Sequence, residues 1–535
     1  NPFLPPSEGT PVDTLPNELL SYIFTLGSEA EEDGDDDDDD DDDDDEDDDD
    51  DDEDEEEDDD DDDDDDSDDD DDDDDDNGED DEEDTPVDEP GKLRLPFKVL
   101  VSHVCRRWRI VAIQTPKLWT HLDFSEGSPF DKSRTWLERS KECPLDIELD
   151  CTVDEEAEAE DSDDQVDVSS NDELDNKKNK SPNRISPLDL PIVRDLILPH
   201  SSRWRVFELM VNDFQIMYGI LSTLASIPEA PQLQALRLYH YDDNEDYVVF
   251  SPKHLEQPFA PFCGRAPNLV QVALWGVHVD WQACAFLRGL EELELAYHAK
   301  NVRPPYEIFV PILQGSPDLH ILTLCASGPA GNPEDWPMDV IELPSVKHLV
   351  LAFIEPSYVS ALMKRLVFPN LSSLALDFDP DDYSSFLELL ARPTPHQRHS
   401  LCQNLIDLKV SGMQCSNAAL DTFYAALPNL TSLNLIATTY KTIFSNISTQ
   451  NDPVGYYLPK LETLTTYGIS GEQMRDLVSQ RTTPSLKRVL MDSGADVTSA
   501  EEAWLRANVG TFDFFDGSDD EDDPTITELD EDEGE

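Results

Sequence analysis

A short apolar template recurs along the C-terminal two-thirds of the chain. In its full form it reads Pro-x-Leu-x-x-Leu-x-Leu, as at Pro231, Leu233, Leu236 and Leu238. Further copies begin at Pro267, Pro317, Pro344, Pro369, Pro428, Pro459 and Pro484, and copies without the proline begin at Trp204, Leu290 and Leu405. Alternating apolar residues are typical of a strand, and the intervening stretches include helical patterns at 358–366, 383–390, 418–427 and 472–478. Each unit therefore predicts one short strand followed by a helix.

This spacing indicates a leucine-rich-repeat solenoid, with residues 144–149 as a candidate twelfth unit. An ordinary α/β domain with a parallel sheet is the alternative, but it would not need a proline before nearly every strand. The repeats lack the usual asparagine after the last leucine; Tyr241, Val277 and Asp379 stand at that position. Residues 504–515 are expected to close the end of the array, and residues 130–140 to form a helix before it.

The strands of such an array line its concave face, where residues between the leucines point outward. These positions are mostly polar, as a protein-binding surface would be, although a solvated sheet face would look the same. The candidate substrate-binding residues are Arg237, His320, Lys347, Asn434, Lys487 and Arg488.

Two further helical patterns precede the array. Leu15, Leu19, Ile23 and Leu26 recur at spacings of four, four and three, which predicts an amphipathic helix over 15–26 with its exit at Gly27. Leu100, Val104, Trp108 and Val111 also fall at helical spacing. The simplest interpretation is two core helices of a small bundle.

The residues of these two patterns resemble the F-box. The similarity covers Leu15-Pro16-x-Glu18-Leu19-Leu20-x-x-Ile23-Phe24, then Val104-Cys105-Arg106-Arg107-Trp108-Arg109, and finally Leu118-Trp119. The resemblance implies a three-helix unit that docks on the Skp adaptor subunit and, through it, on a cullin. By position, the first docking surface would be Leu15, Pro16, Leu19, Leu20, Ile23 and Phe24. Val104, Cys105 and Trp108 would belong to the later helix, part docking surface and part core.

The same resemblance implies a function. The chain would be the substrate-recognition adaptor of an SCF-type E3 ubiquitin ligase, with the repeats holding a protein substrate. Catalysis belongs to other subunits of such ligases, so no catalytic residue is expected in this chain.

A long acidic run separates the two parts of the F-box-like motif. The chain carries 125 acidic and 37 basic residues, and residues 29–89 alone hold 53 acidic residues and no basic one. The expected organisation is a tail (1–14), the first F-box helix (15–28), a disordered acidic insertion (29–90) and the rest of the F-box (91–122). A repeat array (123–515), with a disordered acidic loop at about 152–186, and an acidic C-terminal tail (516–535) follow. The expected fold class is therefore α/β, with a small all-α motif at the front.

The acidic run cannot fold alone, since it offers little apolar surface to offset the loss of backbone entropy. Its charge argues against nucleic acid or an anionic membrane as a partner, because both are polyanions. A basic protein is the partner that it would attract. The alternative function is therefore an acidic binding protein or chaperone for histones or other basic proteins; a solvated spacer and a weak calcium buffer also remain open.

No nucleotide-binding, metalloprotease or hydrolase motif is found, so neither a cofactor nor a metal is expected. The eight cysteines are scattered without a CxxC pair, which argues against a zinc site or a disulfide framework. No apolar run approaches the roughly 20 residues that cross a bilayer. A cytoplasmic or nuclear location is the resulting expectation.

Overall fold

The computed structural model describes residues 15–32, 95–152, 185–241, 247–393, 399–435, 458–481 and 486–515. The chain divides into two compact units, Asn1–Gln114 and Thr115–Glu535. The protein has a mixed α/β fold with a large parallel sheet. The N-terminal tail, most of the acidic insertion, the acidic loop and the C-terminal tail lie outside the described residues, so the disorder expected for them stays a prediction.

The first unit contains three helices in its described part: α1 (Asn17–Glu32), α2 (Phe97–Val104) and α3 (Arg106–Gln114). The helical spacing from Leu100 to Val111 predicted one helix, and this was wrong. Cys105 adopts an extended conformation (φ −156°, ψ 169°) and separates α2 from α3. Val104 therefore ends one helix, and Trp108 lies in the next.

The prediction that the first helix ends at Gly27 was also wrong, because α1 continues to Glu32. Gly27 instead allows α2 to approach closely: a Cβ atom there would lie 2.4 Å from the Phe97 ring. Residues 29–32, assigned to the acidic insertion, are thus the last turn of a helix.

Glu31 joins the two ends of the insertion. Both of its carboxylate oxygens accept a hydrogen bond from the backbone N–H of Phe97, at 2.7 and 2.8 Å. A carboxylate is favourable there because it lies at the positive end of the helix dipole and accepts from an N–H that has no acceptor within the helix itself. The last turn of α1 has no basic residue to balance its acids. Glu31 therefore stabilises α2 from a position 66 residues away.

The second unit is built on one parallel sheet, whose fourteen described strands follow one another in chain order. They are β1 (His121–Leu122), β2 (Leu145–Cys151), β3 (Trp204–Val211), β4 (Ala235–His240), β5 (Gln271–Trp275), β6 (Glu292–Ala296), β7 (Ile321–Cys325), β9 (His348–Ala352), β11 (Ser373–Asp377), β12 (Asp407–Ser411), β13 (Ser432–Leu435), β14 (Thr463–Thr466), β15 (Arg488–Asp492) and β16 (Thr511–Phe515). β8 (Ile341–Glu342) and β10 (Leu366–Val367) form a separate parallel pair.

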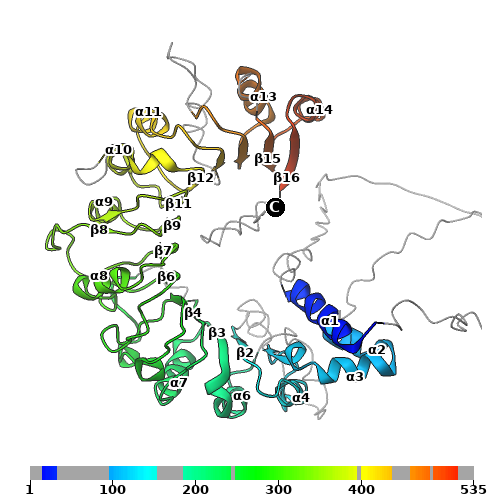
Figure 1. Cartoon of the computed structure of the whole chain (residues 1–535). Helices are drawn as coiled ribbons and strands as arrows, with labels where there is room; N and C mark the ends of the chain where they lie inside the picture. Colours follow the sequence, from blue (N-terminus) through cyan, green and yellow to red (C-terminus); the bar gives the residue numbers. More distant parts are fainter. Residues whose placement is uncertain are drawn as a thin grey trace, which may run out of the picture. The chain divides into compact units, whose positions relative to one another are not determined.

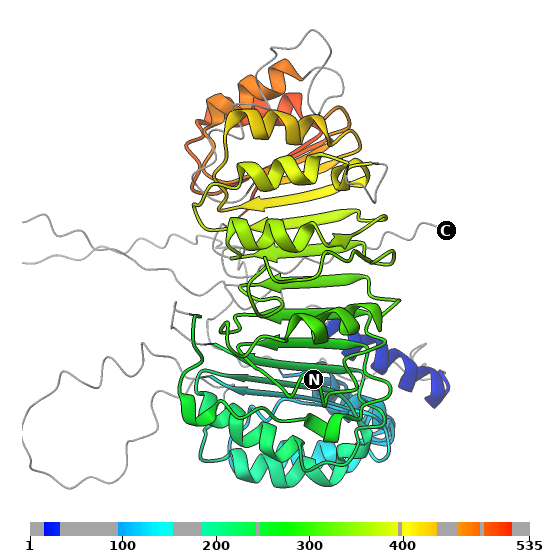
Figure 2. The same ribbon diagram turned by 90° about the vertical axis from the view of Figure 1, so that its left-hand side faces the viewer.

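The described helices of this unit lie along one face of the sheet (Figures 1 and 2). They are α4 (Asp131–Arg139), α6 (Leu190–Ile197), α7 (Phe214–Leu224), α8 (Tyr306–Gln314), α9 (Pro356–Met363), α10 (Ser384–Ala391), α11 (Asn417–Ala425), α13 (Gly471–Gln480) and α14 (Ser499–Asn508), with 3-10 turns η3 (Pro116–Trp119), η5 (Leu198–Arg203), η6 (Lys253–Leu255), η7 (Pro261–Gly264) and η8 (Leu401–Asn404). We call the opposite face of the sheet the open face.

Every unit predicted from the apolar template contains a strand, and the candidate twelfth unit at 144–149 is β2. The proline has a local cause. Pro267, Pro317 and Pro459 stand second in β-turns closed by the N–H of the next leucine, for example Leu269 to the carbonyl of Ala266 at 3.2 Å. Proline suits this position because its fixed φ matches the turn.

A ladder of side-chain hydrogen bonds connects successive units. The residue before the first template leucine donates to a backbone carbonyl of the preceding unit, over 2.6 to 3.1 Å: Asn268, Ser345, Asn370, Asn404 and Asn429 bond to Pro231, Pro317, Pro344, Pro369 and Gln403 respectively. Asparagine is thus absent at the expected position after the strand, but asparagine or serine before the strand forms hydrogen bonds between successive segments.

The boundary between the units differs from the expected one. Residues 115–122, assigned to the F-box, belong to the second unit, where β1 is the first strand of the sheet. Trp119 is buried there against Trp136 on α4, with ring centroids 5.9 Å apart. At the far end, β16 pairs with β15 and buries Phe512, as expected for the closing segment.

Candidate protein-interaction surfaces

The described part of the first unit exposes many large apolar side chains, most of them on its three helices. Nine are more than a third exposed: Leu19, Tyr22, Ile23, Leu26, Leu95, Leu100, Val104, Ile110 and Ile113. All the rest of the described chain adds only eight more. Contiguous apolar surface is rare on proteins that act alone and commonly marks a binding site. We call these nine residues the apolar helical surface.

The face of α1 that carries Leu19, Ile23 and Leu26 points outward, with exposed fractions of 45 to 48%. The other face is internal, because Leu20 and Phe24 are 1% exposed. Leu20 and Phe24 were expected to contribute to a docking surface, but in this structure they are part of the core of the first unit, and a docking role for them stays a prediction. The helix thus buries one of its two apolar faces and leaves the other exposed.

Phe24 packs against Trp108 of α3, with ring centroids 5.0 Å apart, so half-buried Trp108 supports the core of this unit. Val104 is 62% exposed, and Cys105, beside it, is exposed as well. Pro16 is exposed and Leu15 is half-buried. Of the nine proposed docking residues, the structure thus leaves Pro16, Leu19, Ile23, Val104 and Cys105 exposed.

Arg107 fixes the start of α1 against α3. Its guanidinium donates to the carbonyl of Leu15 and to Oδ1 of Asn17, the latter at 3.0 and 3.1 Å. Arg109 donates to the carbonyl of Ser102 at 3.0 Å. Two of the arginines of the motif therefore hold the helices together, which keeps the apolar helical surface in a fixed arrangement.

The open face of the sheet is the second candidate surface. The six polar residues predicted to bind substrate are spread widely over it. Arg237 and Lys487 are paired with Glu208 (3.1 Å) and Glu462 (2.6 Å), and His320 lies 3.6 Å from Glu292. Lys347 and Arg488 are exposed, whereas Asn434 is half-buried. The structure does not bring the six together into one site.

The open face instead carries a row of aromatic side chains that the sequence analysis missed. Tyr239 and Trp275 occupy register positions on β4 and β5, Tyr241 follows β4, and Tyr297 and Phe353 follow β6 and β9. Trp275 contacts Tyr239, Tyr241 and Tyr297 at centroid distances of 5.2, 6.1 and 5.6 Å. Tyr297 in turn contacts Phe353 at 6.4 Å. We call these five residues the aromatic row.

Small residues make room for these rings. Ala296, Cys325 and Ala352 occupy one register position on three successive strands, and Trp275 and Tyr297 pack over them. Tyr297 and Phe353 have positive φ (53° and 50°), a left-handed conformation that turns the chain directly after each strand. An aromatic residue after the last template leucine was the available sequence signal for Tyr239 and Trp275.

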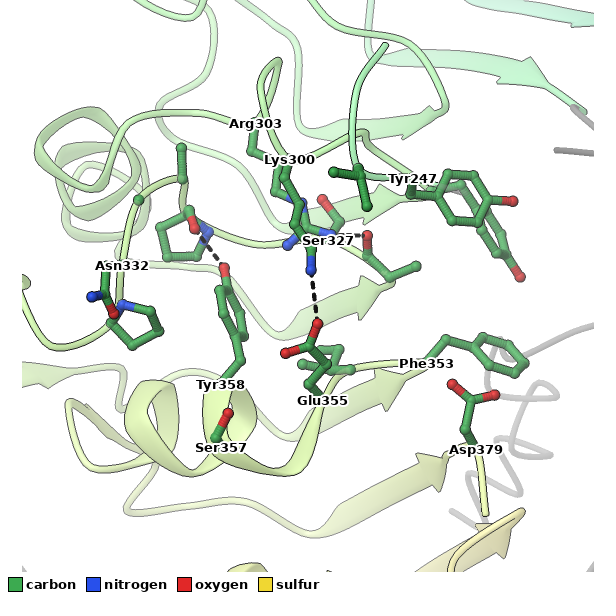
Figure 3. A pocket seen from close by; sticks show the side chains of 18 residues that line it. Tyr247, Lys300, Arg303, Ser327, Asn332, Phe353, Glu355, Ser357, Tyr358 and Asp379 are labelled. Carbon is green, nitrogen blue, oxygen red and sulfur yellow. Dashed lines mark hydrogen bonds and ion pairs between the residues drawn. The ribbon is translucent and has the colours of Figure 1, made fainter. Parts of the chain in front are cut away.

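A pocket of about 920 Å³ adjoins the row at the carboxyl ends of β6, β7 and β9 (Figure 3). Tyr297 and Phe353 line it together with Tyr247, Lys300, Arg303 and Asp379. Lys300 forms a 2.7 Å ion pair with Glu355, and the Tyr358 hydroxyl donates to the carbonyl of Pro329. Arg303 donates to the carbonyls of His298 and Ala326, so its guanidinium braces the pocket wall.

His298 lies fully buried behind this pocket. Its ring nitrogens contact the Ser327 hydroxyl and the carbonyl of Val277, both at 2.9 Å. Burial lowers the pKa of His298 from its ordinary 6.5 to about 3, so the ring is neutral at physiological pH. It therefore works as a hydrogen-bonded strut between the turns that follow β5, β6 and β7.

Burial raises the pKa of Tyr239 and of Tyr297, and neighbouring carboxylates add to both effects. For Tyr239 these are Glu208 and Glu294, and for Tyr297 Asp377. Carboxylates thus lie near both ends of the contact chain from Tyr239 to Tyr297.

No family model matches the chain. A search of curated proteins likewise finds no similar protein. Within the described ranges, no three His, Cys, Asp or Glu side chains are grouped so that they could hold a metal ion. None of the described helices combines the length and hydrophobicity required to cross a membrane.

Proposed function

We propose that this chain is the substrate-recognition adaptor of an SCF-type E3 ubiquitin ligase. The helical unit would be an F-box that docks the Skp adaptor subunit and, through it, a cullin. The stacked strands and helices would be an irregular leucine-rich-repeat solenoid that holds a protein substrate on its open face. In this proposal the chain performs no catalysis itself.

The observation that carries the proposal is the apolar helical surface. Leu19, Ile23 and Val104, which the F-box resemblance assigns to docking, all expose nearly half or more of their side-chain area. Exposed leucine and isoleucine are favourable only when a partner covers them, because burying apolar area contributes roughly 25 cal/mol per Å².

A binding assay with the purified Skp adaptor subunit tests the proposal. Leu19→Asp and Ile23→Asp should each weaken binding at least tenfold, because a carboxylate in an apolar interface loses its hydration without gaining a partner. Ile406→Asp is the matched control, since Ile406 is 51% exposed but lies in the second unit. It should bind like the unmodified chain.

Two outcomes would overturn the proposal. If the unmodified chain does not bind the adaptor, the ligase function is excluded. If it binds and both aspartate variants bind equally well, the apolar helical surface is not the docking site. Circular dichroism on every variant would show whether a loss of binding reflects a loss of fold.

The alternative, an acidic binding protein or chaperone for basic proteins, is favoured by the 53 acidic residues in the 61 positions from Glu29 to Glu89. Because Glu31 bonds to Phe97, a short Gly-Ser linker can replace residues 33–94 without separating the helix ends. If this variant keeps adaptor binding and loses all other partners, the alternative is supported. If it keeps both, the run is a spacer.

A further inference from the structure

The open face of the sheet combines aromatic rings with an excess of carboxylates. We propose that the aromatic row binds a segment of a partner protein that carries exposed arginine or lysine side chains. The inference rests on the proposed function only in making that partner the substrate of the ligase; the binding itself does not depend on the ligase.

The geometry of the rings suits a cationic side chain. Tyr239 and Tyr241 are nearly parallel, with an interplanar angle of 6° and centroids 6.3 Å apart. Trp275 stands almost perpendicular to both, at 90° and 86°. The two tyrosine rings thus face one direction, and the tryptophan ring faces a direction at right angles to it. A guanidinium or ammonium group gains most when it lies over such a face within about 6 Å of its centroid.

Two of the rings are accessible at the surface. Tyr241 is 40% exposed and Phe353 is 37% exposed, so the row can be reached from both of its ends. Trp275 and Tyr297 lie between them over the floor of Ala296, Cys325 and Ala352. Because neighbouring parallel strands are about 4.8 Å apart, the row from β4 to β9 is long enough for several residues of an extended segment.

The charges of this region select a cation. Six carboxylates lie on or beside the row between β3 and β11, against three cationic side chains, and a fourth cation, Lys409, lies on the neighbouring β12. The carboxylates are Glu208, Glu292, Glu294, Glu355, Asp377 and Asp379, and the three cations are Arg237, Lys300 and Arg303.

Most of the cations are already engaged within the protein. Arg237 is paired with Glu208, Lys300 with Glu355, and Arg303 with backbone carbonyls. Burial raises the pKa of Asp377, the hydrogen bond with Ser411 and the charge of Lys409 oppose this effect, and Asp379 adds a smaller increase. The excess of carboxylates favours a cation from outside, whereas a phosphate or an acidic segment would be repelled.

A purely apolar partner fits less well. It would remove the carboxylates from water without providing a counter-charge, and an unpaired buried charge is costly. A basic segment covers the rings with the methylene groups of its arginine or lysine side chains while the charged ends reach the carboxylates. The apolar and the acidic character of the row thus favour the same occupant.

Fluorescence anisotropy with the full chain tests this inference. The probe is a labelled Gly-Ser peptide that carries three arginines, and the same peptide with citrulline, which is neutral and of nearly equal shape, is its control. Measurements at about 0.3 M salt reduce long-range attraction to the acidic stretches. We expect the arginine peptide to bind and the citrulline peptide to bind at least tenfold more weakly.

Substitutions in the row locate the site. Trp275→Ala should weaken binding about tenfold and Tyr241→Ala about threefold. Tyr218→Ala is the matched control, because Tyr218 is half-buried and lies on α7, outside both the aromatic row and the apolar helical surface. Tyr241 is exposed, so its variant should keep the fold even if Trp275→Ala does not. All of these variants keep the same acidic insertion, acidic loop and acidic C-terminal tail, so a difference in affinity comes from the substituted residue.

A photoreactive group beside the central arginine supplies a second readout. Crosslinks to residues 235–300 support the inference, and crosslinks confined to the acidic stretches overturn it. Equal affinity of the unmodified and Tyr241→Ala chains, or equal affinity for arginine and citrulline peptides, also overturns it. Adaptor binding by the same preparations separates the two proposals, since either activity can be lost while the other persists.

Discussion

The two compact units of this protein differ in how completely they bury leucine. We call the first the helical unit and the second the sheet unit. In the sheet unit, the template leucines are fully enclosed; Leu349 and Leu351 of β9 are 0% exposed. In the helical unit, Leu19 and Leu20 are neighbours in sequence, yet one is 48% and the other 1% exposed. In the sheet unit, each strand-and-helix segment covers the apolar side of its neighbour. Three short helices cannot enclose all of their apolar residues. The second unit therefore buries its template leucines completely, whereas the described part of the first unit leaves a larger share of its apolar residues exposed.

Alanine substitutions would sharpen this contrast most strongly. Leu351→Ala should lower the free energy of unfolding by about 3 kcal/mol, because it leaves a cavity in a closed core. Leu19→Ala should change it by no more than about 0.5 kcal/mol, since the side chain is already half in water. Urea unfolding of both variants measures the difference. If Leu19→Ala instead lowers the free energy of unfolding by about 2 kcal/mol or more, another part of the chain covers this surface.

Acid should weaken the sheet unit through His298. The unfolded chain protonates this histidine near pH 6.5, whereas the folded chain resists protonation until about pH 3. Unfolding therefore takes up a proton in this window, so stability is full above about pH 6.5 and falls as the pH drops toward 3. The share of His298 approaches about 1.4 kcal/mol per pH unit.

His298→Gln keeps a side chain that can hydrogen-bond and removes the titration. Chemical unfolding at about pH 6 and pH 4 should show a drop in stability smaller by about 2 kcal/mol for this variant than for the unmodified chain. Comparing the slopes, rather than the stabilities, removes any direct cost of the substitution. Equal slopes for the two chains would refute this account of His298.

The contrast between the units also explains which features the sequence could predict. Strand positions were predicted because the Pro-x-Leu template is local: proline sets the turn, and alternating leucines set the buried face. The exposed side of α1 was not predictable by periodicity, since both of its faces are apolar and packing alone decides between Leu19 and Leu20. The break between α2 and α3 at Cys105 was not predictable either, because no glycine or proline stands there.

The aromatic row was missed for a different reason. The template directs attention to the polar residues between the leucines, whereas the row is made by residues that follow the last leucine. Tyr297 and Phe353 reach it only because the backbone takes a left-handed turn at those two positions, and neither is a glycine. Such a conformation is held by the tertiary structure and has no signature in the residue type.

A smaller loss than those for Leu351 and His298 is predicted at the hydrogen bond between Glu31 and Phe97. Glu31→Gln retains the length of the side chain but replaces the carboxylate that accepts two bonds from the Phe97 N–H with a neutral amide. The loss should be about 1 kcal/mol, as for other acidic groups at helix N-termini, and should shrink with added salt. Glu29→Gln is the control, because Glu29 is exposed two residues earlier on the same helix. Thermal unfolding of both variants in low and high salt measures the effect. If Glu29→Gln costs as much as Glu31→Gln, the acidic end of α1 acts only through its overall charge, and the insertion is not closed by a specific contact.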